Sequence, residues 1–466
     1  MFKKSLIVLS IGAAYLLQAQ DVSTLKNTAD IYAGSSLPGS AKYNAMAGSM
    51  GALGGEASVL NSNPAGIGVA IASDLSATLN IDKVRNTSTL AGQQLDYTLK
   101  NTDLGNVGGI ASFQVSGNSP WRFVNVGVNY SNISTEDYVE TPGNAAINFD
   151  ISDGTGVIDN LTFAGHAYNR YGNMSKMSLG VGGNYDNRLY VGAGLNFHSS
   201  ALDQYDSAAF TSAADGTTDV YNKQYTPYSE SSDGFSASVG VIAKVNPKFR
   251  VGAAIETPTW WTINRVYREY ENPADGTYAE DRKLSTPLKA ALSAAFVPNK
   301  NFALNVDYVL GLSKTKFKEY GIAEQELNNF YSDYGRNVSE IKAGAEYRYE
   351  GFRLRGGYGY AAGAFKDVSI LTFGDQGAVQ STSAGSLLAG NRSTIGAGIG
   401  YDFKSFYIDA AYQNVKANYS SPFLAGSENL NTGYFSDRYI VNSDASAVSD
   451  VDMKRDQFFI TLGWKF

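Results

Sequence analysis

Large apolar residues alternate with small or polar ones over most of the chain, and the alternation continues to the last residue. In the final segment, 456–466, every second position from Phe458 to Phe466 carries a large apolar side chain, whereas Thr461, Gly463 and Lys465 lie between them. A period of two with many aromatic and β-branched residues is typical of a β-strand. Segments of this kind recur, each about ten residues long, which is the length of a tilted strand that crosses a bilayer.

Twelve of these segments form six pairs, each separated by a short turn of the kind that favours hairpin geometry. The predicted hairpins join 110–115 to 122–133, 177–185 to 189–197, 235–245 to 249–256, 288–297 to 302–310, 341–349 to 352–360 and 395–403 to 406–412. A strand at 74–82 precedes them and the strand at 456–466 follows them. Six hairpins and two single strands predict fourteen strands in all.

The short turns alternate with long polar connections at 83–107, 134–175, 201–233, 271–286, 319–337, 362–391 and 419–454. A soluble sandwich has no reason to place every long connection on one side, whereas an outer-membrane barrel has short periplasmic turns and long external loops. We therefore expect an all-β fold, a 14-stranded antiparallel transmembrane β-barrel over 74–466 with long extracellular loops.

The two faces of the pair 341–349 and 352–360 differ in chemistry. One face is apolar and aromatic, and the other carries the charged residues Lys342, Glu346, Arg348, Arg353 and Arg355. A Lys or Arg side chain that faces lipid at the bilayer midplane costs about 2–4 kcal/mol, so this face must line the lumen. The charges lie near the short-turn end, where we expect them to anchor a segment inside the barrel; binding of an anionic ligand is the alternative.

The first twenty residues have the features of a secretory signal peptide. Lys3 and Lys4 precede an apolar run at 5–17, and Leu17-Gln18-Ala19 is a plausible cleavage site. The apolar run is too short to cross a hydrocarbon core about 30 Å thick at 1.5 Å per residue. We expect 1–20 to be removed on export to the outer membrane of a Gram-negative bacterium.

Residues 21–73 lack the period of two and are dominated by small residues. A fourteen-stranded barrel is too wide for its wall side chains to fill, so this segment is expected to fold inside it as a hatch, or plug. The large apolar residues of this segment are the candidate ligand pocket: Leu37, Met46, Met50, Leu53, Val59 and Leu60.

A glycine-rich Ala52-Leu53-Gly54-Gly55 stretch leads through Glu56 to Asn63, Pro64, Ala65 and Gly66, shortly before the first strand. This arrangement resembles the plug of the FadL/OmpP1/TodX family of outer-membrane transporters of hydrophobic compounds. The resemblance implies a fourteen-stranded barrel with an amino-terminal hatch and passive uptake of compounds such as long-chain fatty acids or aromatic hydrocarbons. It also implies a role for Asn63, Pro64 and Ala65 in holding the shape of the plug. Relatives open sideways at a kinked third strand; the third strand here, 122–133, contains Gly127 but no proline.

Composition excludes several other classes of protein. Of the 466 residues, 43% are hydrophobic, but no run is long enough for a transmembrane helix. The formal net charge of -7 argues against a nucleic-acid-binding protein, which would carry a basic surface. With no cysteine the chain has neither disulfides nor thiolate metal sites.

The sequence offers little for catalysis or metal binding. His166 and His198 are the two histidines, and Asp150, Asp153 and Asp159 lack the spacing of a calcium-binding loop. The motifs of serine hydrolases, phosphate-binding loops and dinucleotide-binding folds are missing. We expect no enzyme activity, no catalytic residue, no cofactor and no metal site.

Two functions remain after these exclusions. The first is passive uptake of a hydrophobic small molecule through an apolar pocket between wall and plug, with outer-membrane lipid as the surroundings. The second is a structural subunit of a larger outer-membrane secretion or assembly machine, because a shared fold does not fix an activity. Tyrosines of the long connections, among them Tyr221, Tyr225, Tyr228 and Tyr334, could then contact other outer-membrane proteins.

Overall fold

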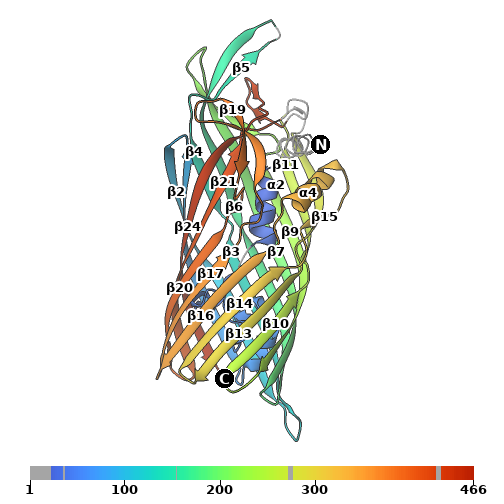
Figure 1. The fold of residues 1–466 in the computed structure, drawn as a ribbon, viewed down its shortest axis with the longest axis vertical. Coiled ribbons are helices and arrows are strands. Elements are labelled where there is room, and N and C mark those ends of the chain that lie inside the picture. Colours follow the sequence, from blue (N-terminus) through green and yellow to red (C-terminus); the bar gives the residue numbers. More distant parts are fainter. Residues whose placement is uncertain (1–21, 35–36, 154, 271–275, 427–431) are drawn as a thin grey trace, which may run out of the picture.

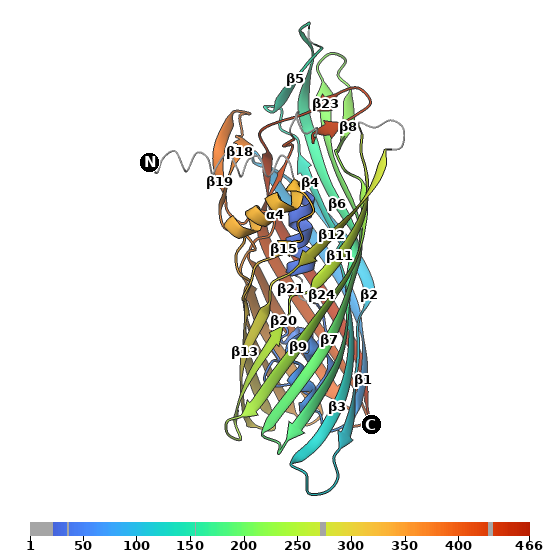
Figure 2. The ribbon, with the colours of Figure 1, turned by 90° about the vertical axis from the view of Figure 1, so that its right-hand side faces the viewer.

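The computed structural model describes residues 22–34, 37–153, 155–270, 276–426 and 432–466. The expected signal peptide at 1–20 lies outside these residues. A tall barrel forms the body of the molecule, with the carboxyl terminus at its lower end (Figures 1 and 2). No helix in the described ranges is long and apolar enough to cross a membrane.

The wall is a closed antiparallel sheet, because each wall strand pairs with the next and the last pairs with the first. Its fourteen strands are β1 (Asp74–Leu90), β2 (Gln93–Gln114), β3 (Trp121–Ser134), β6 (Val157–Tyr185), β7 (Leu189–Ser212), β9 (Tyr228–Lys244), β10 (Phe249–Glu256), β13 (Lys289–Asn299), β14 (Phe302–Gly311), β16 (Ser339–Tyr349), β17 (Phe352–Ala361), β20 (Arg392–Asp402), β21 (Phe406–Phe423) and β24 (Ala447–Lys465). Each of the fourteen predicted strands overlaps one of them, so the predicted fold class is confirmed.

The long connections are more ordered than the expected loops. β1 and β2 stay paired up to a tight turn at Ala91 and Gly92, whose φ values of 48° and 78° suit a two-residue hairpin, so most of 83–107 is strand. The other connections contain β4 (Asp137–Pro142), β5 (Asn148–Ser152), β8 (Thr218–Lys223), β11 (Trp260–Arg268), β12 (Thr277–Ser285), β15 (Lys316–Phe317), α4 (Ile322–Asp333), β18 (Val368–Phe373), β19 (Val379–Ala384), β22 (Tyr434–Phe435) and β23 (Ile440–Val441).

These connections are ordered because they bury apolar side chains of their own. Phe163, Phe210, Tyr221, Phe423 and Tyr434 belong to a hydrophobic core made by β6, β7, β8, β21 and β22 beyond the plug. Figure 2 shows β8 at the upper end of the molecule, next to β23. Because the connections are polar in composition, the sequence did not reveal this core. The prediction that they are loops is corrected, since they contain strands and a helix.

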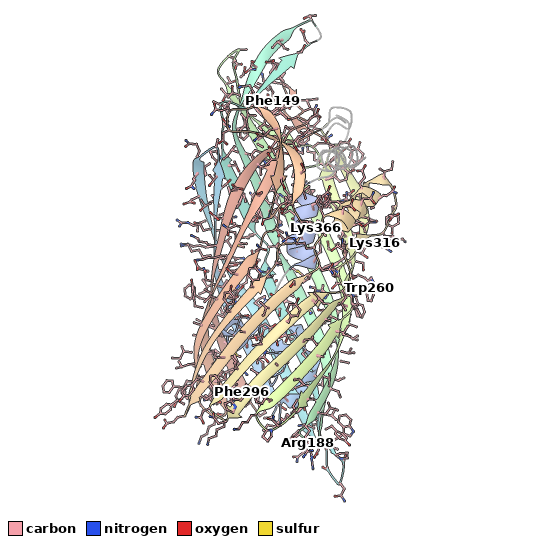
Figure 3. The ribbon with its side chains drawn as sticks, in the orientation of Figure 1. Phe149, Arg188, Trp260, Phe296, Lys316 and Lys366 are labelled. Carbon is pink, nitrogen blue, oxygen red and sulfur yellow. The ribbon has the colours of Figure 1, made fainter. Side chains whose placement is uncertain are left out.

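The outer face of the lower barrel is apolar. Val181, Val239, Leu292, Leu354 and Ile395 expose 52–63% of their surface there. Aromatic rings flank this region: Phe249 and Phe296 lie 4.7 Å apart near the short turns, and Trp260 lies higher on the wall (Figure 3). An apolar belt between two aromatic levels is the outer surface expected of a membrane-spanning barrel.

The amino-terminal segment lies inside the barrel as helical pieces (Figure 1). The upper part of this plug consists of α2 (Val22–Asn27) and the π-helix η1 (Thr28–Ala33). The lower part contains α3 (Ala41–Ala45) and two 3₁₀ helices, η2 (Ala57–Asn61) and η3 (Pro64–Val69), and β1 begins shortly afterwards at Asp74. The expected plug inside the barrel is therefore present, and it is built of short helical pieces.

Glycines of the wall make room for the lower plug. A Cβ atom added at any of them would lie between 2.0 and 3.2 Å from a plug atom, which is closer than van der Waals contact. These positions are Gly108, Gly127, Gly180, Gly182, Gly192, Gly240, Gly252, Gly344, Gly357, Gly396 and Gly398. The alternation of glycine with large residues thus sets how closely wall and plug approach each other.

We predict that Gly357→Val destabilises the folded protein. An added Cβ would lie 2.3 Å from the Met46 carbonyl carbon, and overpacking of this kind costs about 1–3 kcal/mol. Thermal unfolding in detergent, together with limited proteolysis of the plug, measures the effect. Gly356→Val is the control, because the nearest atom to a Cβ there is 3.8 Å away. Equal losses in both variants would contradict close wall–plug packing as the cause.

Candidate functional site

The lower plug has a hydrophobic core of its own. Met46, Met50 and Val59 are almost fully buried in it, and Leu53 packs against it. Leu60 also belongs to this core, but it reaches the cavity described below, as does Leu37. Of the six residues predicted to form a ligand pocket, the structure therefore brings two to the cavity and places the other four in the packing of the plug.

The Asn63-Pro64-Ala65-Gly66 segment joins the plug to the wall. The Asn63 Oδ1 atom accepts the Ala65 N–H at 3.1 Å and caps η3, and Pro64 takes the first helical position, where its missing N–H costs nothing. The Asn63 side-chain amide donates to the carbonyl oxygens of Gly51, at 2.8 Å, and of Val241 on β9, at 3.3 Å. One side chain thus links two parts of the plug and a wall strand.

The predicted lumen charges pair with one another and with acids of the wall. Glu346 accepts from Arg355 at 2.7 Å and lies 2.5 Å from an Arg348 nitrogen, and Arg355 also reaches Asp409 at 2.7 Å. The two remaining pairs are Arg353 with Asp402, at 3.2 Å, and Lys342 with Glu340, at 2.9 Å.

The ion-pair partners of these five residues thus lie in the wall. Within the described residues, the five do not anchor the plug through ion pairs, contrary to the expectation. The physical reason is composition, because residues 37–73 contain Lys42 and Glu56 as their only charged side chains. Hydrogen bonds hold the lower plug instead: the Asp307 carboxylate accepts the Gly51 N–H at 3.1 Å, and Ser49 donates to the Asn305 carbonyl at 3.0 Å.

The upper plug is anchored by buried charges that the sequence did not reveal. Arg265 on β11 and Glu230 on β9 form an ion pair of 2.8 Å. The Arg265 guanidinium donates to Thr24 at 3.2 Å, and the Tyr32 hydroxyl donates to Glu230 and contacts Ser232. A buried ion pair needs further hydrogen bonds to be tolerated, and the plug supplies them here.

Lys26 makes a second anchor for α2. Its ammonium lies 2.8 Å from Asp30 on the same helical segment and 2.8 Å from Asp137 on β4. Burial alone would lower the pKa of Lys26, but the attraction of Asp137 and Asp30 outweighs it and raises this pKa well above the usual value. Lys26 therefore stays charged. The spacing of Lys26 and Asp30 by four residues was the one visible signal of this anchor.

A cavity of about 420 Å³ lies between the upper plug, the lower plug and the wall. Part of its lining is apolar: Leu37, Leu60, Ile133, Met174, Ala254, Ala291, Val309 and Val338. Its basic side chains outnumber its acidic ones; the basic ones are Lys26, Arg170, Lys176, Lys289, Lys314, Arg336, Lys342, Arg392 and Arg455, and the acidic ones are Asp30, Glu136, Asp137, Glu256, Asp307 and Glu340. The apolar pocket expected from the sequence is thus corrected to a cavity of mixed character with an excess of positive charge.

One corner of the cavity contains Lys289, which Glu256 and Glu340 attract but with which neither forms a direct ion pair. Glu256 lies 3.3 Å from the Lys176 ammonium and accepts from Asn196 and Ser236 at 3.2 and 3.1 Å. Lys289 is opposite Glu256 in the β10–β13 register, yet it forms no ion pair with any described residue. Its ammonium is therefore available to a ligand in the cavity.

The two histidines have structural partners. The His166 Nε2 atom lies 3.0 Å from Asp206, and its ring stacks on Phe423, whereas the His198 Nε2 atom lies 3.1 Å from the Ser236 hydroxyl. Within the described residues, no three His, Asp or Glu side chains are placed to hold a metal ion.

The third wall strand is continuous. β3 pairs with β2 from Phe123 to Ser131 and with β6 from Phe123 to Ser134, and its register shifts only at its lower end, between Trp121 and Phe123. Gly127 lies within this paired stretch against Ile67 and Leu60 of the plug. In this structure the wall is therefore closed at the strand that is kinked in relatives.

We predict that Asn63→Ala loosens the plug. The variant removes the η3 cap and leaves the Gly51 carbonyl without this donor, and the two losses together cost about 2–4 kcal/mol. Faster proteolysis of the plug in the folded protein and a lower Tm measure the change. Ser62→Ala is the matched control, because the Ser62 hydroxyl bonds only within the plug, to the Val59 carbonyl and to Tyr43. Equal protection of the plug from protease in both variants would contradict the role of Asn63 in linking the plug to the wall.

Neither a family model nor a curated protein sequence matches the chain. Solved structures do match its fold. A Pseudomonas aeruginosa FadL homologue aligns with a TM-score of 0.56 at 11% identity, over 93% of this chain and 99% of that one. The toluene transporters TodX of P. putida and TbuX of Ralstonia pickettii each align with a TM-score of 0.53, at 12% and 14% identity, over 92% of this chain and 98% of theirs. The chain therefore has the fold of the FadL and TodX transporters, as the resemblance of its plug predicted.

Proposed function

We propose that the chain is a channel in the outer membrane of a Gram-negative bacterium for the passive uptake of hydrophobic small molecules. Three features support this proposal: the apolar outer belt, the short turns at one end with ordered extensions at the other, and a fold similar to that of a FadL homologue and of two toluene transporters. Outer-membrane lipid surrounds the wall in this proposal.

The cavity between the two parts of the plug carries the proposal. Its volume of about 420 Å³ lies within the range of about 300–1,000 Å³ typical of small-molecule sites. The wall surrounds it, and the core of the lower plug lies beneath it, so a solute that leaves toward the periplasm requires the plug to rearrange. The lower plug is suited to this because hydrogen bonds rather than ion pairs join it to the wall.

The charges of the cavity narrow the class of solute. A neutral hydrocarbon would gain nothing from Lys289 and would leave its ammonium without a partner. An amphipathic carboxylate, such as a long-chain fatty acid, would place its chain against Met174, Ala291 and Val309 and its head group on Lys289. We therefore assign acidic amphiphiles as the substrate class.

The structural-subunit alternative draws support from the ordered extracellular part. The buried core around Phe163, Phe210 and Phe423 gives this part a fixed surface, as a protein contact requires. Copurification from mild detergent separates the two functions. A stoichiometric set of partner proteins would favour the subunit, whereas an isolated barrel that retains a lipid-like molecule favours the channel.

We predict that Lys289→Met weakens binding of a long-chain carboxylate about tenfold, since a charge-assisted hydrogen bond contributes about 1.5–3 kcal/mol. Binding of the alcohol of the same chain length, the matched ligand, should change little. Tryptophan fluorescence or calorimetry on the detergent-solubilised protein measures both affinities. Equal weakening of acid and alcohol would rule out Lys289 as the head-group site.

We further predict that Ala291→Trp abolishes uptake and binding of both ligands, because residue 291 lines the cavity and a large ring would fill it. Leu292→Trp is the control, since the adjacent Leu292 points outward and exposes 63% of its surface. Cellular uptake of a labelled fatty acid is the readout. Unimpaired uptake by a correctly folded Ala291→Trp variant would exclude this cavity from the transport path.

A further inference from the structure

The outer face of the wall carries lysines on two neighbouring strands. In the segment around β15, Thr315 and Phe317 are buried, whereas Lys314, Lys316 and Lys318 are exposed. The alternation places Lys316 and Lys318 on the side opposite the lumen, whereas Lys314 reaches the cavity. Lys316 is labelled on the outside of the wall in Figure 3.

A neighbouring strand extends this row. β12 pairs with β15 through Leu284 with Phe317 and Ser285 with Lys316, and the Lys318 N–H donates to the Lys283 carbonyl at 2.8 Å. The exposed Lys283 is therefore next to Lys318. We call Lys283, Lys316 and Lys318 the lysine patch; Lys314 is left out because its ammonium donates to the Ser332 carbonyl.

The lysine patch is not neutralised by the protein. No ion pair of its three members occurs among the described residues, and the Lys318 ammonium lies 5.0 Å from the centre of the Tyr320 ring. Acids on the same outer surface are Asp233 and Asp281 on nearby strands and Glu319, which accepts from Asn328 at 3.1 Å. The chain has a net charge of -7, but these three adjacent lysines without ion pairs make this part of the surface positive.

Register fixes the height of the patch on the wall. Trp260 pairs with Ser285, and Ser285 pairs with Lys316, so Lys316 lies in the same row as the exposed Trp260 ring. Trp260 stacks on Phe235 at 6.4 Å, and Phe235 lies 5.6 Å from Phe197, which makes an aromatic level. Such levels mark the boundary between hydrocarbon and head groups.

The residues on either side of this row agree with that boundary. On the side of the short turns, Val239, Ile255 and Leu292 are exposed and apolar, whereas on the other side Thr262 and Asn264 are exposed and polar. The lysine patch therefore lies at head-group height, at the end of the barrel that carries the long extensions.

We propose that the lysine patch binds the phosphate groups of a phosphorylated glycolipid of the outer leaflet, the class to which lipid A belongs. This inference rests on the proposed outer-membrane location and not on transport. Lysine ammonium groups bind phosphate as compact point charges, and Trp260 and Tyr320 offer amphipathic rings beside them for the sugar and the upper acyl chains. The binding site is on the outside of the wall, separate from the cavity.

The test compares two triple variants of the full-length protein in detergent. Lys283→Gln/Lys316→Gln/Lys318→Gln removes the lysine patch, and Lys248→Gln/Lys300→Gln/Lys404→Gln removes the same charge from exposed short turns at the other end. Native mass spectrometry or thermal-shift titration with diphosphoryl lipid A measures affinity. We expect the first variant to bind lipid A at least about tenfold more weakly, because each lysine near an anionic surface increases the affinity roughly fivefold. The control variant should bind with the affinity of the wild type.

The same measurements distinguish phosphate recognition from other causes. The wild type should have a low affinity for lipid A that lacks both phosphates. This affinity should equal that of the patch variant for diphosphoryl lipid A. Unchanged affinity in the patch variant, equal loss in the control, or equal binding of phosphatidylglycerol would each overturn the proposal. Circular dichroism and heat-modifiable gel migration show whether the variants fold, and a second set with Arg at the three patch positions should restore binding.

Binding of a long-chain carboxylate, measured on the same samples, keeps this inference separate from the proposed function. Both variants should bind the carboxylate normally, because neither changes a residue that lines the cavity. Failure of the wild type to bind the carboxylate would count against the channel alone. Failure to bind diphosphoryl lipid A would count against the lysine patch alone.

Discussion

A wall of fourteen strands closed on itself encloses more space than its own side chains can fill, and the rest of the structure depends on how that space is filled. The chain fills the lower half with a compact segment of small residues, for which wall glycines such as Gly192, Gly357 and Gly396 make room at backbone distance. Close approach of two backbones leaves few voids, so the lower barrel is sealed by packing rather than by charge.

The two parts of the plug are held by different forces. Buried ion pairs and their hydrogen bonds fix the upper part through Lys26 and through Arg265 with Glu230, whereas hydrogen bonds and apolar packing fix the lower part. Breaking a buried ion pair costs about 3–5 kcal/mol, and losing a hydrogen bond about 1–3 kcal/mol. The lower part is therefore the one that can move at modest cost, and the cavity lies directly against it.

Much of the fold was predictable from the sequence, because a strand between lipid and lumen must alternate strictly, as 456–466 and the pair around Glu350 do. The plug was predictable from its lack of alternation and from Asn63-Pro64-Ala65-Gly66. The core around Phe163 and Phe423 in the long connections was missed, since its apolar residues are spread over several polar segments. The pocket residues were misjudged for a different reason: Met46 and Val59 are large and apolar whether they face a ligand or pack a core, and composition does not distinguish the two. The charges that line the cavity come from many strands, and their convergence is visible only in three dimensions.

The pairing of β24 with β1 has a consequence for assembly. The plug precedes β1 in the chain, and the ring is completed only when the last strand joins the first along the whole register from Asp74–Lys465 to Thr89–Asp450. Because wall and plug approach within backbone distance at many glycines, a finished ring leaves no path along which the plug could thread into place. Biogenesis must therefore gather the amino-terminal segment first and close the sheet around it, so the order of synthesis, with the plug made before any strand, matches the order that the geometry demands.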